Sequence, residues 1–119
     1  MGEFTLGAME SRFADMIWAR EPVSSTELVK LAAQELGWKK STTYTVLKRL
    51  SERGLFVNDG GTVRALISRS DYYAERSERF VDESFSGSLP AFLAAFTSRK
   101  QLTDKEIDEL QSLIDNMRG

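Results

Sequence analysis

The chain has 119 residues, of which 41% are hydrophobic and 29% are charged, a balance typical of a soluble globular protein. Its 16 Lys and Arg residues and 18 Asp and Glu residues give a net charge of −2, which does not by itself indicate a nucleic-acid binder. The absence of Cys and His excludes disulfides, thiolate zinc sites, cysteine nucleophiles and Ser-His-Asp triads. No apolar run is long enough to cross a bilayer, so we expect a cytoplasmic protein without direct membrane association.

The charges are unevenly distributed along the chain. Residues 1–69 carry ten basic and eight acidic side chains, whereas residues 70–119 carry six and ten. The basic excess is concentrated in residues 38–69, where seven Lys and Arg residues accompany two acidic ones. A basic middle and an acidic C-terminal part indicate two functions in one polypeptide. A chance cluster of solvated charges is the alternative.

Two helices are predicted in the first third of the chain. Apolar side chains at helical spacing predict the first over residues 6–19, with Thr5 as its N-cap. The second is predicted over residues 25–36, because Ser24 and Glu27 form a capping box directly before an apolar stripe.

A third helix is predicted over residues 40–53, and Gly54 ends it. Its inward face follows the i, i+3, i+4, i+7 spacing of a buried stripe and comprises Thr43, Val46, Leu47 and Leu50. The opposite face and the first turn carry lysines, hydroxyls and a tyrosine: Lys40, Ser41, Thr42, Tyr44, Thr45 and Lys48. This helix therefore has one face for the core and another for a partner.

The apolar period changes after Gly54. Residues 55–57 and 62–67 predict two strands, because they are apolar and β-branched and flank a turn sequence. Gly60-Gly61 supplies the positive φ values that a tight hairpin needs. Val23, far upstream, can add a brief strand.

Residues 70–119 return to helical spacing. Ser70 is predicted to cap a helix running to about residue 84, and a short helix follows from Leu89. The capping box Thr103-Asp104-Lys105-Glu106 predicts the start of the last helix.

The order helix, helix, helix, hairpin is that of a winged helix-turn-helix. We therefore expect a mainly α fold with a small β-hairpin, with a winged-helix DNA-binding domain over residues 1–69 and a helical region over residues 70–119. Such domains insert the third helix into the major groove, while the wing reaches the flanking backbone. Lysines would neutralise phosphates there, and hydroxyls would bond phosphates or base edges. Tyr44 would pack on a thymine methyl or sugar, and Arg64 would contact DNA from the wing.

Several of these residues also have a purely structural interpretation. Lys48 and Arg49 can serve to compensate the helix dipole. Tyr44 can lie over the neighbouring helix, and Arg64 can pair with Asp59 across the hairpin. The two tryptophans are interpreted as core anchors: Trp18 and Trp38.

The C-terminal helices carry more apolar surface than so small a unit can cover internally. We expect the same segment of a second chain to cover it, the alternative being that these helices fold back on their own winged domain. The expected dimer contacts are Phe80, Phe85, Leu89, Phe92, Phe96, Ile107, Leu110, Leu113, Ile114 and Met117.

No catalytic site is predicted. The neighbouring acids Asp82-Glu83 and Asp108-Glu109 diverge on their helices, so they are interpreted as solvated faces. Gly60-Gly61 is a hairpin tip and not a phosphate-binding loop. We therefore expect no enzyme activity, no metal and no cofactor.

Segments along nearly the whole chain, from about Leu6 to Met117, together resemble one known family. They are Leu6 to Glu10 leading to Ile17-Trp18, TTYTVLKRLSERG at residues 42–54, Asp71-Tyr72, residues 85–89 and residues 102–110. In order and spacing they resemble the BlaI/MecI/CopY, or penicillinase-repressor, family of bacterial transcriptional regulators.

The resemblance implies a homodimeric repressor that binds a palindromic double-stranded DNA operator at antibiotic-resistance or metal-homeostasis promoters. It implies an N-terminal winged helix and a C-terminal three-helix dimerisation region. It matches Lys40, Ser41, Thr42, Tyr44, Thr45 and Lys48 to the family's recognition helix, and Thr62 and Arg64 to its wing.

The chain departs from the family pattern in three places. It lacks the C-terminal cysteine pairs of the copper-responsive branch, which excludes copper sensing of that kind. In the lactamase-type branch, a membrane sensor with a metalloprotease domain triggers cleavage between Asn and Phe in the fifth helix. The matching pair here is Ala95-Phe96. The link after the wing is shorter than usual, and Leu66 or Ile67 replaces an aromatic residue.

We expect repression by occlusion of the promoter, relieved by proteolysis or by an unknown signal acting on the C-terminal helices. The alternative is a winged-helix module for protein interaction that dimerises but does not bind DNA. Replacing Lys40 and Lys48 discriminates between the two.

Overall fold

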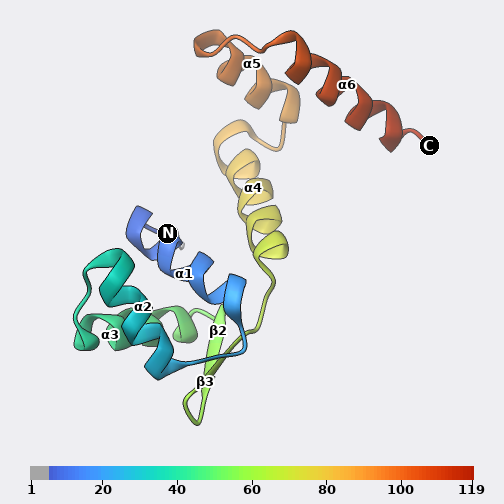
Figure 1. The fold of residues 1–119 in the computed structure, drawn as a ribbon. Coiled ribbons are helices and arrows are strands. Elements are labelled where there is room, and N and C mark those ends of the chain that lie inside the picture. The colour runs from blue at the N-terminus through green and yellow to red at the C-terminus, as the bar shows by residue number, and fades with distance from the viewer. Residues whose placement is uncertain (1–5) are drawn as a thin grey trace. The chain divides into compact units, whose positions relative to one another are not determined.

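The computed structural model describes residues 6–119, which form six helices and three strands (Figure 1). These residues divide into two compact units, with the boundary between Ala74 and Glu75. The predicted class is confirmed, since the described chain is mainly helical with one small antiparallel sheet. In chain order the elements are α1 (Ala8–Arg20), β1 (Val23–Ser24), α2 (Ser25–Leu36), α3 (Lys40–Glu52), β2 (Phe56–Asp59), β3 (Thr62–Ala65), α4 (Arg69–Phe85), α5 (Leu89–Arg99) and α6 (Asp104–Met117).

The first two helices start at polar caps. Gly7 is the N-cap of α1, and its amide donates to Glu10 Oε1 at 3.2 Å, while Thr5, the predicted cap, lies outside the described residues. Ser24 Oγ accepts from the Glu27 amide at 3.0 Å, as predicted for α2. Gly37 ends α2 at φ +70°, a left-handed conformation that glycine adopts without steric cost.

The sheet has three strands in the order β1-β3-β2, so the hairpin is extended by β1, whose Val23 pairs with Val63. The hairpin turn consists of Gly60 and Gly61, at φ +61° and +95°. The predicted strand limits are corrected. Asn58 and Asp59 belong to β2, because the turn needs only the two glycines, and β3 ends at Ala65.

The hydrophobic core of the first unit lies between α1, α2, α3 and the sheet. Trp18 packs against it, with its ring centroid 5.2 Å from that of Phe56 and 5.7 Å from that of Tyr72. Its indole Nε1 donates to the Ile67 carbonyl at 3.0 Å, across 49 residues of chain. Trp38 contacts Phe13 at 5.1 Å between ring centroids. Both tryptophans are core anchors, as predicted.

The start of α4 is fixed to α1. Arg69 Nε donates to Asp15 Oδ1 at 2.8 Å, and the guanidinium carbon lies 4.8 Å from the centre of the Tyr73 ring. The Asp15 carboxylate raises the pKa of the Arg69 guanidinium through this bond. Ser70, the predicted cap, lies within the helix, because Ser68 Oγ already accepts from the Asp71 amide at 3.0 Å.

In the second unit, polar caps start both remaining helices. Ser88 Oγ accepts from the Ala91 amide at 3.1 Å at the start of α5. Thr103 and Glu106 form the predicted capping box of α6, and hydrogen bonds from Thr103 lower the pKa of the Glu106 carboxyl below its usual range. Neither α5 nor α6 contains a buried residue in this single chain.

The Trp18 hydrogen bond yields a stability prediction. Replacing Trp18→Phe removes the donor for the Ile67 carbonyl while keeping an aromatic ring, and it should lower the free energy of unfolding by about 1–2 kcal/mol more than Trp38→Phe does. For Trp38, the structure of residues 6–119 gives no hydrogen bond to the indole. Urea denaturation followed by circular dichroism measures both variants. Equal losses would contradict a role for the hydrogen bond.

Candidate nucleic-acid interface

The inner face of α3 determines what its outer face presents. Thr43, Val46, Leu47 and Leu50 are at most 6% exposed, as the spacing predicted. The face of the helix opposite this stripe therefore points to solvent. The exposed residues that carry the predicted DNA contacts are Lys40, Ser41, Thr42, Thr45 and Lys48.

The basic residues within α3 differ in their pairing. Arg49 forms an ion pair with Glu10 of α1, so its charge is compensated inside the protein. Within residues 6–119, no salt bridge involves Lys40 or Lys48, so both ammonium groups remain available to an anionic partner. Arg49 thus makes a structural contact with α1, a role other than the predicted compensation of the helix dipole, and the two lysines provide the positive charge of the outer face.

Tyr44 lies at the edge of this face and is half-buried. Its hydroxyl donates to Ser25 Oγ at 3.2 Å, and its ring packs against the core cluster. Tyr44 therefore ties α3 to the first turn of α2, which is the structural alternative that the sequence left open. Only part of its ring remains for an external partner.

The wing places Thr62 and Arg64 on β3, both exposed. Arg64 Nη2 donates to Asp59 Oδ2 at 3.1 Å, so the alternative of a pair across the hairpin is realised. Both side chains are at least half exposed, and such a pair contributes only about 0–1 kcal/mol. A phosphate could therefore compete with Asp59 for Arg64.

A groove of 440 Å³ separates α3 from the wing, and we name it the α3–β2 groove. Residues from the sequence prediction and others that it missed line this groove: Tyr44, Leu47, Lys48, Ser51, Val57 and Asn58. Ser51 continues the helical stripe of Tyr44 and Lys48 by one turn, a signal present in the sequence. Val57 and Asn58 reach the groove because β2 packs beside α3, which the sequence pattern does not specify.

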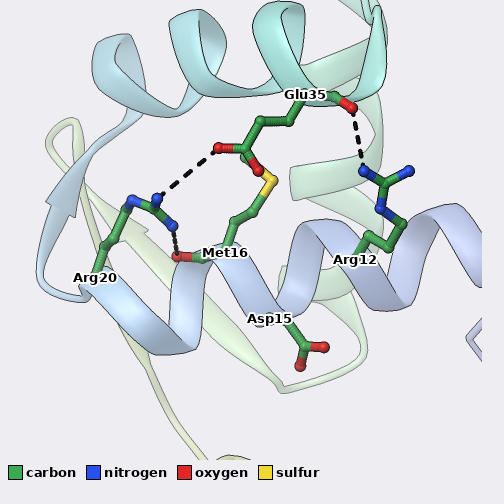
Figure 2. A pocket seen from close by; sticks show the side chains of 5 residues that line it. All are labelled: Arg12, Asp15, Met16, Arg20 and Glu35. Atoms are coloured by element: carbon green, nitrogen blue, oxygen red, sulfur yellow. Dashed lines mark hydrogen bonds and ion pairs between the residues drawn. The ribbon is translucent and has the colours of Figure 1, made fainter.

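A second pocket, of 300 Å³, lies between α1 and α2 (Figure 2). Figure 2 shows Arg12 and Arg20 on either side of Glu35. Arg12 Nη2 donates to the Glu35 carbonyl at 3.2 Å, and Arg20 approaches the Glu35 carboxylate at 3.9 Å. Since Glu35 lies in the last turn of α2, these contacts fix the end of the helix that leads into α3. Residues of both charge signs line the pocket. We interpret the contacts of Arg12 and Arg20 with Glu35 as a clamp that holds the end of α2 against α1.

The predicted dimer contacts lie in α4, α5 and α6. Four phenylalanines form a cluster with ring centroids 5.7–6.1 Å apart: Phe80, Phe85, Phe92 and Phe96. Large apolar side chains of this set are 44–74% exposed: Phe80, Leu89, Phe96, Ile107, Leu113, Ile114 and Met117. Phe85, Phe92 and Leu110 are half-buried. The Ala95-Phe96 pair is exposed within the regular helix α5.

Across residues 6–119, no three Asp or Glu side chains come close enough to hold a metal ion. None of the helices described is long and apolar enough to cross a membrane.

Comparison with known proteins places these features in one family. The sequence profile of the penicillinase repressors matches residues 6–116. The penicillinase repressor of Bacillus licheniformis is 28% identical over 108 residues, which cover 87% of this chain and 84% of that protein. The match spans the winged helix and the C-terminal helices together. The chain belongs to the penicillinase repressor family, a family of transcriptional repressors.

Proposed function

We propose that the protein is a homodimeric repressor that binds a palindromic DNA operator through the outer face of α3 and the wing. One observation carries the proposal: two lysines without ion pairs among residues 6–119 and three exposed hydroxyls share the outer face of a helix whose inner face is buried. Membership of a repressor family supplies the functional class. RNA polymerase would be excluded from a promoter that the dimer occupies.

The chemistry of this face suits the two levels of DNA recognition. Lys40 and Lys48 would neutralise phosphates and fix the position of α3 in the major groove. Ser41, Thr42 and Thr45 carry short hydroxyls that can bond base edges or phosphates. The wing would add Thr62 and Arg64 on the flanking backbone. Affinity that rests on phosphate neutralisation falls steeply as salt rises.

Dimerisation is the second part of the proposal. Residues 1–69 would read DNA, and residues 70–119 would join two chains. The exposed apolar side chains of α5 and α6 support this, because a monomer would leave them in contact with water. Two linked reading helices bind a palindrome more tightly than one, because the second contact becomes intramolecular.

Relief of repression would follow from weakening the dimer. Cleavage at Ala95-Phe96, triggered by a membrane sensor with a metalloprotease domain, would separate α6 from the remainder of the chain. The loss of bivalent binding would reduce operator affinity by about 10²–10⁴. An unknown signal acting on the same helices would have the same consequence.

Reversing the charge of both lysines tests DNA binding directly. The double variant Lys40→Glu and Lys48→Glu should abolish binding to duplex DNA, because four units of charge change on the face that meets phosphates. The matched control, Lys30→Glu with Lys105→Glu, makes the same change in net charge at exposed positions outside α3 and should bind like the wild type. Fluorescence anisotropy with labelled duplex measures both. Undiminished binding by the α3 variant would refute the role of this face in DNA binding, whereas a wild type that binds no duplex would support the module that dimerises without binding DNA.

The Arg64–Asp59 pair yields a prediction in which DNA affinity rises instead of falling. Replacing Asp59→Asn releases Arg64 and removes a negative charge from the wing, so DNA affinity should rise about two- to fivefold at low salt. In an Arg64→Ala background the same Asp59→Asn change should raise affinity less, because only the loss of the negative charge remains. An equal gain with and without Arg64 would contradict a contribution from the released arginine.

The molar mass in solution tests whether the chain forms a dimer. Light scattering of the full chain at micromolar concentration should give about twice 13.4 kDa. Ile114→Glu places a charge in the apolar stripe of α6 and should shift the mass to that of the monomer, whereas Gln111→Glu should leave the dimer intact. A monomeric wild type would refute this part of the proposal.

A further inference from the structure

The α3–β2 groove combines an apolar floor with a polar rim. Leu47 is 2% exposed and Val57 is half-buried, so the floor is made of aliphatic carbon. The rim carries the Lys48 ammonium, the Ser51 hydroxyl and the Asn58 amide. Among the described residues, no acidic side chain lines the groove, whereas Asp15 and Glu35 line the pocket between α1 and α2.

Hydrogen bonds already in place define what the rim can offer. The Asn58 Oδ1 accepts from the Gly61 amide at 3.0 Å, which orients the side chain and leaves its Nδ2 as the group that can donate outward. Ser51 Oγ donates to the Leu47 carbonyl at 2.9 Å, so its proton is used within the helix. The Ser51 hydroxyl therefore has no proton left to donate to a ligand. Its role is steric, because a small side chain at this position leaves the groove open.

One sugar–phosphate unit of the DNA backbone complements this groove, because it also has an apolar part beside a polar, charged part. Deoxyribose presents an apolar face, and the adjoining phosphate requires cations and N–H donors. We propose that the α3–β2 groove holds one sugar–phosphate unit of a bound strand, with Lys48 and Asn58 on the phosphate. Leu47 and Val57 lie under the sugar. This inference rests on the proposed function and adds Asn58, Ser51 and Val57 to its contact surface.

The proposed contact is with the DNA backbone, so it should contribute to binding whatever the base sequence. Variants of the groove should weaken binding to any duplex, so the probe is a labelled duplex of random sequence, measured by fluorescence anisotropy at low salt. Asn58→Asp keeps an acceptor for the Gly61 amide but replaces the outward donor by an anion. Ser51→Leu fills the groove without changing charge.

Both variants should weaken binding about fivefold or more, while Ser70→Leu, the same substitution at an exposed position of α4, should bind like the wild type. Weakening by Asn58→Asp alone would indicate a long-range charge effect and overturn the proposal, as would weakening by Ser51→Leu alone. Val57→Leu narrows the groove from the other wall and replaces Ser51→Leu if circular dichroism shows that variant to be unfolded. A wild type that binds no duplex would refute the proposed function itself.

Discussion

The burial of one face of α3 is the constraint that determines which side chains its outer face presents to a partner. Thr43, Val46, Leu47 and Leu50 enter the core at helical spacing, and this fixes the rotation of the helix about its axis. The clamp of Arg12 and Arg20 on the last turn of α2, and the Tyr44–Ser25 hydrogen bond, hold the two ends of the preceding helix. The positions of the outward lysines and hydroxyls follow from these internal contacts.

Ion pairs within the first unit determine which basic side chains remain available to an external partner. Arg49, Arg64 and Arg69 each have a carboxylate partner, on α1 or on the hairpin. Their charges therefore contribute little to an external field, although the Arg64 partner is exposed enough to be exchanged for a phosphate. The lysines of α3 have no such partner among the described residues. Two cations without an ion pair among residues 6–119 therefore lie together on the outer face of one helix, in a chain whose net charge is −2.

Local sequence signals predicted the elements and the face that α3 presents, because caps, glycine turns and helical spacing act within a few residues. Ser24 and the Gly60-Gly61 turn lie where they were predicted. Contacts between residues far apart in sequence were not predictable in this way. The Arg49–Glu10 pair joins residues 39 apart, and the groove wall formed by Asn58 requires β2 to lie beside α3. Ser70 was mistaken for a cap because Ser68, two residues earlier, has the same capping chemistry.

The central claim is that the outer face of α3 and the adjoining wing meet duplex DNA. Amide chemical shifts measured by NMR during titration with duplex DNA test it most directly, since they report every backbone position in one experiment. We predict that the largest changes occur at Ser41 to Lys48 and along the hairpin from Asn58 to Arg64. Changes concentrated instead around Arg12, Arg20 and Glu35, or no changes at all, would contradict the account.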